Sequence, residues 1–320
     1  MNRKIVTFTM SPRQSQFEVD RLETEANKMG IEVNKALYRE LSFEIGQPRG
    51  TARTFVRGEE LTVENTLGLW FRVAGTKSGK YTEARNLAIR ILGEKIFCVN
   101  KKGYLGWTRM GKIAQHGVFL ENDIPVVPTK IFYTREQILN PSALRAAPLD
   151  KGANIKNTFF GWEYPVIAKH ERGYQGKSVR KFENREEMEK FVNKINEKNL
   201  GMFLWQKFLP TKWDIRVMIV GGKAIGGMKR SAVGEEFRSN FSLGGAVEVW
   251  NLNEEEKNLA EKVALVCGLD YGGVDIMKDE NGKNYILEVN RQCQFQGFEK
   301  ATGINVAKTI VEMMEKSRYS

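Results

Sequence analysis

The sequence predicts a mixed protein, an open α/β domain followed by an α+β region, and two observations carry this prediction. Over about residues 1–99, apolar strands alternate with helices in β-α-β order, which is typical of an open α/β domain. Beyond residue 100, strands joined by glycine-containing turns predominate, with a few separate helices. With 320 residues, 41% of them hydrophobic, the chain favours two or three domains over one.

The first domain is predicted from its hydrophobic periodicity. Residues 15–29 carry apolar side chains at near-helical spacing, and Gly30 ends that run. A second helix is closed by Gly93. The strands are predicted at 3–9, 31–38, 67–73 and 95–99, and the helices at 15–29 and 81–92.

The remaining chain begins with a helix near 109–120 and a strand at 129–133. Residues 140–164 contain two prolines and two glycines before a third proline, and we expect an irregular insertion there. Strand, turn and strand then alternate, with helices predicted near 185–196, 254–267 and 303–316.

Composition narrows the function classes. No apolar run approaches the roughly 20 residues of a membrane span, and the first eight residues read as a strand, so a cytoplasmic protein is expected. Three cysteines and two histidines argue against a disulfide framework and a multi-histidine metal centre. The net charge of +11 fits either a solvated basic surface or an anionic partner. Without basic blocks or interleaved aromatics, nucleic acid ranks below small anions.

The first candidate motif is a strand that delivers Lys169 to a loop containing Gly173 and Gly176. Glycines let backbone N–H groups approach phosphate oxygens, and a fixed lysine adds a positive charge. The spacing is not that of a Walker P-loop. A plain hairpin turn with a surface lysine is the alternative.

The second motif is an apolar strand that ends at a proline, over residues 203–210. Polar groups in this segment could read the edge of an adenine, and an ordinary edge strand is the alternative. The residues concerned are Gln206, Lys207, Phe208 and Leu209.

Arginines mark the third motif, a strand pair over residues 214–230 followed by residues 237–245. By the period of two, Asp214, Arg216 and Met218 share one face of their strand. Arg216, Arg230 and Arg238 could converge on a phosphate or carboxylate, since the guanidinium fork suits bidentate contacts. Surface ion pairs are the alternative interpretation of these arginines.

The most informative motif is a predicted hairpin with Asn281 and Gly282 as its two turn residues. This register places Asp275 directly opposite Glu288, with Asn290 on the same face. Opposed carboxylates repel each other, and a cation resolves the conflict. Two carboxylates and an amide oxygen suit Mg²⁺. A solvent-facing pair balanced by Lys283 or Arg291, or another register, remains open.

On these motifs, the sequence resembles the RimK-type branch of the ATP-grasp superfamily, which includes enzymes that add amino acids to protein or small-molecule carboxylates. The resemblance runs from about Lys112 to Val306. It is densest at residues 214–216, 237–240, 244–245, 272–275, 287–290 and 297–305.

The resemblance implies an ATP-grasp fold in which two α+β subdomains clasp ATP. We expect an N-terminal α/β domain at 1–99, a central ATP-grasp subdomain at 100–200 and a C-terminal one at 201–320. It further implies an ATP-dependent carboxylate–amine ligase that works through an acyl-phosphate, with one or two Mg²⁺ ions and Mn²⁺ as an alternative. The substrates are a carboxylate, as a small molecule, peptide or protein, and an amine such as an amino acid.

The resemblance also implies roles for individual residues. Lys112 and Lys169 would touch the ATP phosphates, the backbone of Lys207 and Phe208 would meet adenine, and Asp214 the ribose. Near the acyl-phosphate lie Arg238, Ser239 and Asn240, and the metal ligands are Asp275, Glu288 and Asn290.

Three departures from the family pattern qualify these roles. Lys207 stands where the family usually has an acidic residue, and the stretch from Leu209 to Asp214 is short. Residues 291–296 replace the small residues and proline that often follow Asn290, so the usual glutamate specificity is not assumed, and Cys293 is expected in a pocket wall. A macrocyclising or peptide-modifying ligase, a non-catalytic basic nucleotide- or nucleic-acid-binding protein, and a homo-oligomer remain open.

Overall fold

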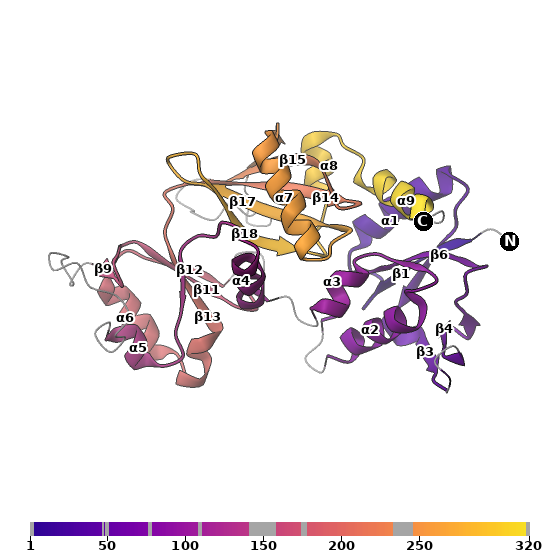
Figure 1. Ribbon diagram of the computed structural model, residues 1–320, viewed down its shortest axis with the longest axis horizontal. Coiled ribbons are helices and arrows are strands. Elements are labelled where there is room, and N and C mark those ends of the chain that lie inside the picture. Colours follow the sequence, from indigo (N-terminus) through magenta and orange to yellow (C-terminus); the bar gives the residue numbers. More distant parts are fainter. Residues whose placement is uncertain are drawn as a thin grey trace.

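The structure is a computed structural model that describes residues 3–46, 48, 51–75, 79–107, 111–140, 158–173, 178–232 and 246–317. Three larger sheets organise the chain (Figure 1). No helix within these residues is long and apolar enough to cross a membrane.

The first sheet confirms the predicted open α/β arrangement. Its four strands are all parallel and lie in the order β2-β1-β6-β7. Gly30, with a φ of +71°, follows the first helix, and Gly93 caps the second. The elements are β1 (Lys4–Thr9), α1 (Gln16–Lys28), β2 (Val33–Leu37), β6 (Thr66–Phe71), α2 (Lys80–Leu92) and β7 (Phe97–Cys98).

Some neighbouring elements were not predicted. A small antiparallel sheet lies between β2 and β6 in sequence, and a short helix follows β7. These are η1 (Tyr38–Glu40), β3 (Leu41–Glu44), β4 (Arg53–Val56), β5 (Glu59–Glu60) and α3 (Lys101–Gly106).

The second sheet belongs to a part of the molecule that we call the central lobe. It has the order β12-β11-β13-β8, with antiparallel pairs, and a short hairpin, β9 with β10, lies in the segment predicted as irregular. The elements are β8 (Thr129–Ile131), α5 (Arg135–Leu139), β9 (Thr158–Phe159), β10 (Trp162–Glu163), β11 (Val166–His170), β12 (Val179–Phe182), α6 (Arg185–Lys194), η5 (Glu197–Met202) and β13 (Phe203–Lys207).

Strand β13 bears on two sequence predictions. It lies between β11 and β8, so it is an interior strand and not an edge strand. It also lies beyond residue 200, where the sequence suggested a domain division, and the three-domain division stays a prediction.

The third sheet has five antiparallel strands in the order β16-β15-β14-β17-β18. Side chains on one face of β14, including Ile215 and Val217, pack with α4 and α7, and Met218 on the other face packs with α8 and α9. The elements are α4 (Lys112–Glu121), β14 (Trp213–Val220), β15 (Lys223–Ser231), β16 (Ala246–Trp250), α7 (Glu254–Val266), β17 (Tyr271–Lys278), β18 (Asn284–Asn290), α8 (Gln296–Thr302) and α9 (Val306–Lys316).

The first and third sheets are joined by one hydrophobic core, which we call the shared core. Helices α1 and α9 pack against each other within it (Figure 1). The Arg21 guanidinium adds polar contacts, because it donates to Glu299 Oε2 at 3.0 Å and to Asn305 Oδ1 at 3.1 Å. The shared core contains, among others, Ile5, Leu22, Ala26, Trp70, Met218, Tyr271, Phe298, Val306, Ile310 and Met314.

Asn100 adds buried hydrogen bonds to the junction between the first and third sheets. It has a left-handed φ of 62° and is 1% exposed. Its amide nitrogen donates to the carbonyls of Tyr271 and Arg291, and its amide oxygen accepts from the N–H groups of Asp270 and Tyr271. One side chain therefore ties the end of the first sheet to the third.

The central lobe has a core of its own, which we call the lobe core. It is rich in aromatic rings, with Trp205 against Phe159 and Phe182 at centroid distances of 5.3 and 5.9 Å. Its buried residues come from the lobe alone: Phe132, Ile138, Phe159, Val166, Ala168, Phe182, Met188, Val192, Leu200 and Trp205.

Candidate active site

The predicted hairpin is formed by β17 and β18, and Asp275 does lie opposite Glu288. The reason differs from the one predicted. Asp279 N–H donates to the Lys283 carbonyl, so the loop between them has three residues and not two. A register shift between Asp275 and Ile276 then inserts one extra residue in β18, which restores the predicted pairing.

In the structure, the charge of Asp275 is balanced by arginines. Arg216 donates to both carboxylate oxygens, at 2.8 and 2.7 Å, and Arg230 Nη2 lies 2.9 Å from Oδ2. Burial opposes ionisation, but the two guanidinium groups hold the pKa of Asp275 down at about 2. Arg230 also donates to Asp214, at 2.6 Å. Neither Lys283 nor Arg291, the balancing residues considered from sequence, makes this contact.

Glu288 is balanced by a different element. Lys112, at the start of α4, lies 3.2 Å from Glu288 Oε2, and its ammonium donates to the Gly173 carbonyl at 2.8 Å. The Asn290 amide nitrogen donates to Glu288 Oε1 at 3.0 Å. Lys112 therefore links the acidic hairpin to the beginning of the glycine loop.

Lys169 lies on β11 and carries a perturbed charge. Burial lowers its pKa to about 8, and the positive charge of Lys112 acts in the same direction, while Glu288 opposes the shift. A lysine whose charge is weakly compensated in this way is suited to an anionic ligand.

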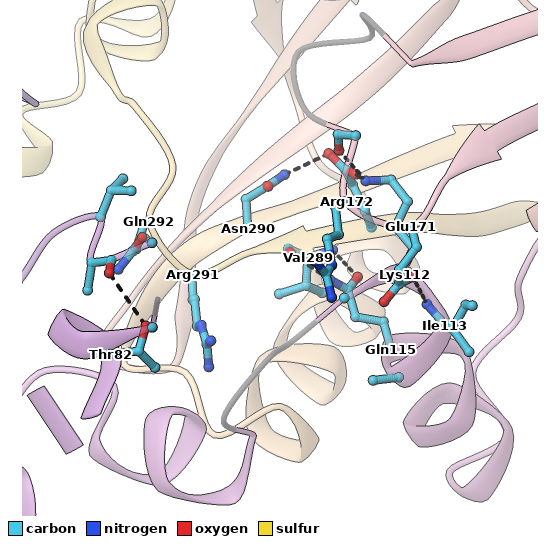
Figure 2. Close-up of a pocket in the computed structure, with 18 of the residues that line it drawn as sticks. Thr82, Lys112, Ile113, Gln115, Glu171, Arg172, Val289, Asn290, Arg291 and Gln292 are labelled. Carbon is cyan, nitrogen blue, oxygen red and sulfur yellow. Dashed lines mark hydrogen bonds and ion pairs between the residues drawn. The ribbon is translucent and has the colours of Figure 1, made fainter. Parts of the chain in front are cut away.

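Lys112, Glu288 and Asn290 line a cleft of about 850 Å³, whereas Lys169, Arg216, Arg230 and Asp275 are not among its lining residues. Figure 2 shows Lys112, Ile113 and Glu171 towards one end of it, Asn290 further along, and Arg291, Gln292 and Thr82 towards the other. Glu171 holds the first end together, because its carboxylate accepts from the Ile113 N–H at 2.7 Å. The cleft is thus lined by all three parts of the chain.

The candidate adenine segment lies on β13 and just after it. Gln206 is 3% exposed, its amide nitrogen donates to Thr129 Oγ1 at 2.8 Å, and its amide oxygen is buried without a partner among the described residues. The Lys207 N–H donates to the Pro128 carbonyl. Phe208 carries Lys181 over its ring, and the Leu209 carbonyl accepts from Thr211 N–H.

Several predicted site residues cannot be compared with the structure. Gly176, Arg238, Ser239 and Asn240 lie outside the described residues. Cys293 can be compared, and it is not in the wall of this cleft. Its thiol is buried beside Met218 and Tyr271 in the shared core, and burial raises its pKa.

Two residues of the site, Gln115 and Arg85, were missed by sequence reasoning, whereas Arg291 belongs to the segment expected to face the substrate. Gln115 exchanges two hydrogen bonds with the backbone of Val289 and so protects the edge of β18. Arg85 and Arg291 line the cleft wall away from Lys112. Arg85 offered a signal, since it lies four residues before Ile89 on the apolar face of its predicted helix.

The oxygen donors fit Mg²⁺ in chemical type. Glu288 and Asn290 line the cleft with hard oxygen atoms, and histidine and thiolate ligands are absent from its described wall. Asp275 is adjacent on the same hairpin but engaged by two arginines. Within the described residues, no group of three or more His, Cys, Asp or Glu side chains could hold a metal alone.

Comparison with known proteins gives a family and a fold. A model of the RimK-like ATP-grasp domain matches residues 131–314. A probable alpha-L-glutamate ligase of Shewanella frigidimarina is 35% identical over 155 residues, which are 48% of this chain and 51% of that protein. Human beta-citrylglutamate synthase B is 31% identical over 152 residues, 47% of this chain and 39% of that protein. The chain thus spans about half the length of the curated relatives it matches, or less.

Solved structures resemble the chain over nearly its whole length. The ATP-grasp ligase PsnB, complexed with a phosphomimetic variant of a minimal precursor, Mg and ADP, has a TM-score of 0.68 at 17% identity, covering 100% of both chains. A Chryseobacterium gregarium RiPP-associated ATP-grasp ligase, in complex with ADP and a leader and core peptide, has a TM-score of 0.70 at 17% identity, covering 99% of this chain and 97% of that one. At such identity, the likeness shows the ATP-grasp fold.

Proposed function

Because this chain belongs to the RimK-like ATP-grasp family, we propose that it is an ATP-dependent ligase that joins a carboxylate to an amine. It would release ADP and phosphate and work in the cytoplasm, where ATP is supplied. The observation that carries the proposal is the pair Asp275 and Glu288 on the hairpin, with Lys112 against Glu288 and Arg216 and Arg230 against Asp275.

This arrangement supports the binding of a nucleotide triphosphate. Lys112 brings positive charge to the end of the cleft near the glycine loop, where the phosphates would lie, and Lys169 is near enough to Lys112 and Glu288 for their charges to act on its pKa. The buried and unpartnered Gln206 oxygen supports an adenine site, since it can accept from the exocyclic amine. Asp214 remains the proposed ribose contact, although its carboxylate is bound by Arg230.

Magnesium would be held by Glu288 and Asn290, with Asp275 joining when an arginine turns to the substrate. When bound, one or two Mg²⁺ ions, with Mn²⁺ as an alternative, would neutralise charge on the phosphate oxygens. The proposed ligands lie on a hairpin whose two carboxylates already form ion pairs, Glu288 with Lys112 and Asp275 with Arg216.

The reaction proceeds in two balanced steps. A carboxylate oxygen of the substrate attacks the γ-phosphorus of ATP, an O–P bond forms, and the bond to the bridging oxygen breaks to release ADP. The amine nitrogen then attacks the acyl carbon, a C–N bond forms and phosphate leaves with the C–O bond pair. The proton of the amine goes to water, because arginine cannot accept it.

Arginines are proposed to hold the reacting groups. Arg216 and Arg230 are held near each other by Asp275 and Asp214, and an arginine that turns from Asp275 to the substrate would neutralise the incoming carboxylate and the transferred phosphoryl group. Arg238, Ser239 and Asn240 are proposed to complete this region on the strength of the family resemblance.

The test is a screen of carboxylates with ATP, Mg²⁺ and hydroxylamine, with nucleotide products and product mass measured. We expect ADP and a hydroxamate, which an acyl-phosphate forms with hydroxylamine. AMP in place of ADP would indicate adenylate chemistry and overturn the mechanism. Nucleotide binding without turnover of any carboxylate and amine pair would favour a non-catalytic binding protein.

A peptide-modifying ligase is the second candidate. The solved ligase structures with bound peptides align with nearly the whole of this chain, including its N-terminal sheet. The curated relatives match only about half of it, and this difference favours the second candidate. Phosphate release that depends on a peptide, and not on a small amine, would support this candidate.

A further inference from the structure

The cleft wall at the end away from Lys112 carries two arginines that the proposed chemistry does not use, one from the region of the first sheet and one from the region of the third. Arg85 lies on α2 and is 3% exposed, and Arg291 directly follows the last residue of β18. Both line the cleft, at the end away from Lys112, and Figure 2 shows Arg291 there beside Gln292.

The two guanidinium groups are held in place by one aromatic ring. Arg85 lies 3.8 Å and Arg291 4.8 Å from the centroid of the Tyr104 ring. The Tyr104 hydroxyl is itself fixed, since it donates to the Phe71 carbonyl and accepts from the Gln292 amide. The cations are therefore pre-positioned, which lowers the cost of ordering them around a ligand.

Neither arginine has a carboxylate partner in the part of the chain that the structure describes. Arg85 donates through Nε and Nη2 to the amide oxygen of Asn86, and Arg291 donates through Nη1 to the carbonyls of Gly103 and Trp107. Among the described residues, no carboxylate oxygen lies within ion-pair distance of either, in contrast to Arg216 and Arg230.

The positive charge of this wall is only weakly compensated. The Glu83 carboxylate lines the same cleft, but it makes no ion pair with either guanidinium group. A cation that is largely removed from water without a paired anion is costly, and a bound anion offsets that cost. The planar guanidinium fork fits a carboxylate in particular.

We propose that Arg85 and Arg291 bind a carboxylate of the substrate that is not the one phosphorylated. The inference rests on the proposed ligase function. The reacting carboxylate would lie near Asn290 and the acidic hairpin, and the second one at Tyr104. The second carboxylate belongs either to a dicarboxylate acyl donor or to an amino-acid acceptor, and the same site chemistry serves both.

The test is a calorimetric titration of the full chain, with and without Mg²⁺ and the ATP analogue AMPPNP. Glutarate is compared with butyrate for the donor, and L-alanine with ethylamine for the acceptor. We expect one of these pairs to favour the ligand with the extra carboxylate by about ten- to one-hundred-fold, as a charge-assisted hydrogen bond allows. The pair that shows the preference identifies the reactant.

The variants Arg85→Gln and Arg291→Gln should each abolish the preference while AMPPNP affinity stays unchanged. Arg90→Gln is the matched control, because Arg90 is exposed on the same helix. If Arg85→Gln fails to fold, the titrations of Arg291→Gln and of the wild-type protein with the two ligand pairs still test the inference. No preference in either ligand pair, or a preference that survives in both variants, would overturn this inference. Failure to bind AMPPNP with the preference intact would instead refute the ligase proposal.

Discussion

The shared core and the lobe core differ in how they are built from the chain. The shared core takes residues from both ends of the chain, with Leu22 packed in the same cluster as Ile310. The lobe core takes all of its buried residues from between Phe132 and Trp205. The acidic hairpin and the Arg85–Arg291 wall thus belong to one joined body, and Lys169 belongs to a separate one. We therefore expect the central lobe to move as a unit when the cleft closes.

The largest effect is expected at the hairpin of the joined body. Asp275→Asn should stop turnover and also destabilise the protein by about 3–5 kcal/mol, because it removes the carboxylate that Arg216 binds through two hydrogen bonds and leaves the buried Arg230 with Asp214 alone. Glu288→Gln should lower turnover by about a thousandfold with little change in melting temperature, since Glu288 is 30% exposed. Activity assays and thermal melts check both.

Glu280→Gln, at the exposed hairpin tip, is the control for these variants. If repulsion between the opposed carboxylates predicted from the sequence were the main effect, removing either charge would preserve the fold. For Asp275 the arginine contacts contradict that expectation. The same contacts mean that Arg230→Ala should lose stability as well as activity. Full Mg²⁺-dependent activity in Glu288→Gln would refute the metal assignment.

The two cores can be compared directly with one cavity in each. Ile310→Ala in the shared core and Val192→Ala in the lobe core remove side chains that are both 0% exposed. We expect Ile310→Ala to lower the free energy of unfolding by about 2–5 kcal/mol and to speed hydrogen exchange in both the first and the third sheet. Val192→Ala should cost less and act within the lobe. Exchange measured by mass spectrometry that spreads equally in both variants would contradict two separate cores.

A pH effect is expected from the lobe lysine. Since the pKa of Lys169 is about 8 in the free protein, AMPPNP affinity should be constant below pH 7. Above pH 8 it should fall towards tenfold per pH unit, because bound phosphate requires the charged form. Lys169→Met should bind weakly at every pH, and Lys169→Arg should remove the fall. A profile in wild type that stays flat to pH 9.5 would reject the placement of Lys169 at the phosphates.

For folding alone, the sign of the Lys169 effect is reversed. Its folded pKa lies below the ordinary lysine value of 10.5, so the unfolded chain binds more protons between pH 8 and 10.5. The contribution of Lys169 to the free energy of unfolding therefore rises through that range. Denaturant titrations at the two pH values separate this effect from nucleotide binding.

The smallest effect is expected at the polar rim of the shared core. Arg21→Gln should cost about 1 kcal/mol, because it removes partly exposed bonds from α1 to Glu299 and Asn305. Lys35→Gln, which breaks exposed pairs with Asp20 and Glu23, is the control and should cost less. A cost for Arg21→Gln as large as that of Ile310→Ala would mean that the junction is held by ions and not by apolar packing.

The sequence predicted the helices and strands with clear periodicity but not how they share cores. Period-two alternation correctly placed Asp214, Arg216 and Met218 on one face of β14. Met218 on that face packs with α9, whereas Ile215 and Val217 on the opposite face pack with α4 and α7. The pairing of Asp275 with Glu288 was predicted correctly, although the predicted two-residue turn was wrong. The three-residue loop shifts the register by one residue, and the bulge in β18 shifts it back. Bulges depend on neighbouring strands, which local sequence does not encode.

Other features could not be predicted because they depend on contacts between distant segments. The partners of Asp275 come from β14 and β15, and the partner of Glu288 comes from α4. The sequence suggested that Arg216, Arg230 and Arg238 could converge on a phosphate or carboxylate. The structure brings Arg216 and Arg230 together on a protein carboxylate, and Arg238 lies outside the described residues. Arg85 and Arg291 are 206 positions apart in the numbering and meet only through Tyr104.

Asn100 has a consequence for exchanging parts between proteins of this fold. Its position requires a residue that accepts a left-handed backbone and offers both an amide donor and an amide acceptor. Glycine would satisfy the backbone alone, and aspartate would lack the donor. A chimera that grafts a foreign first sheet onto this third sheet should therefore keep asparagine at the crossover, whatever else is exchanged.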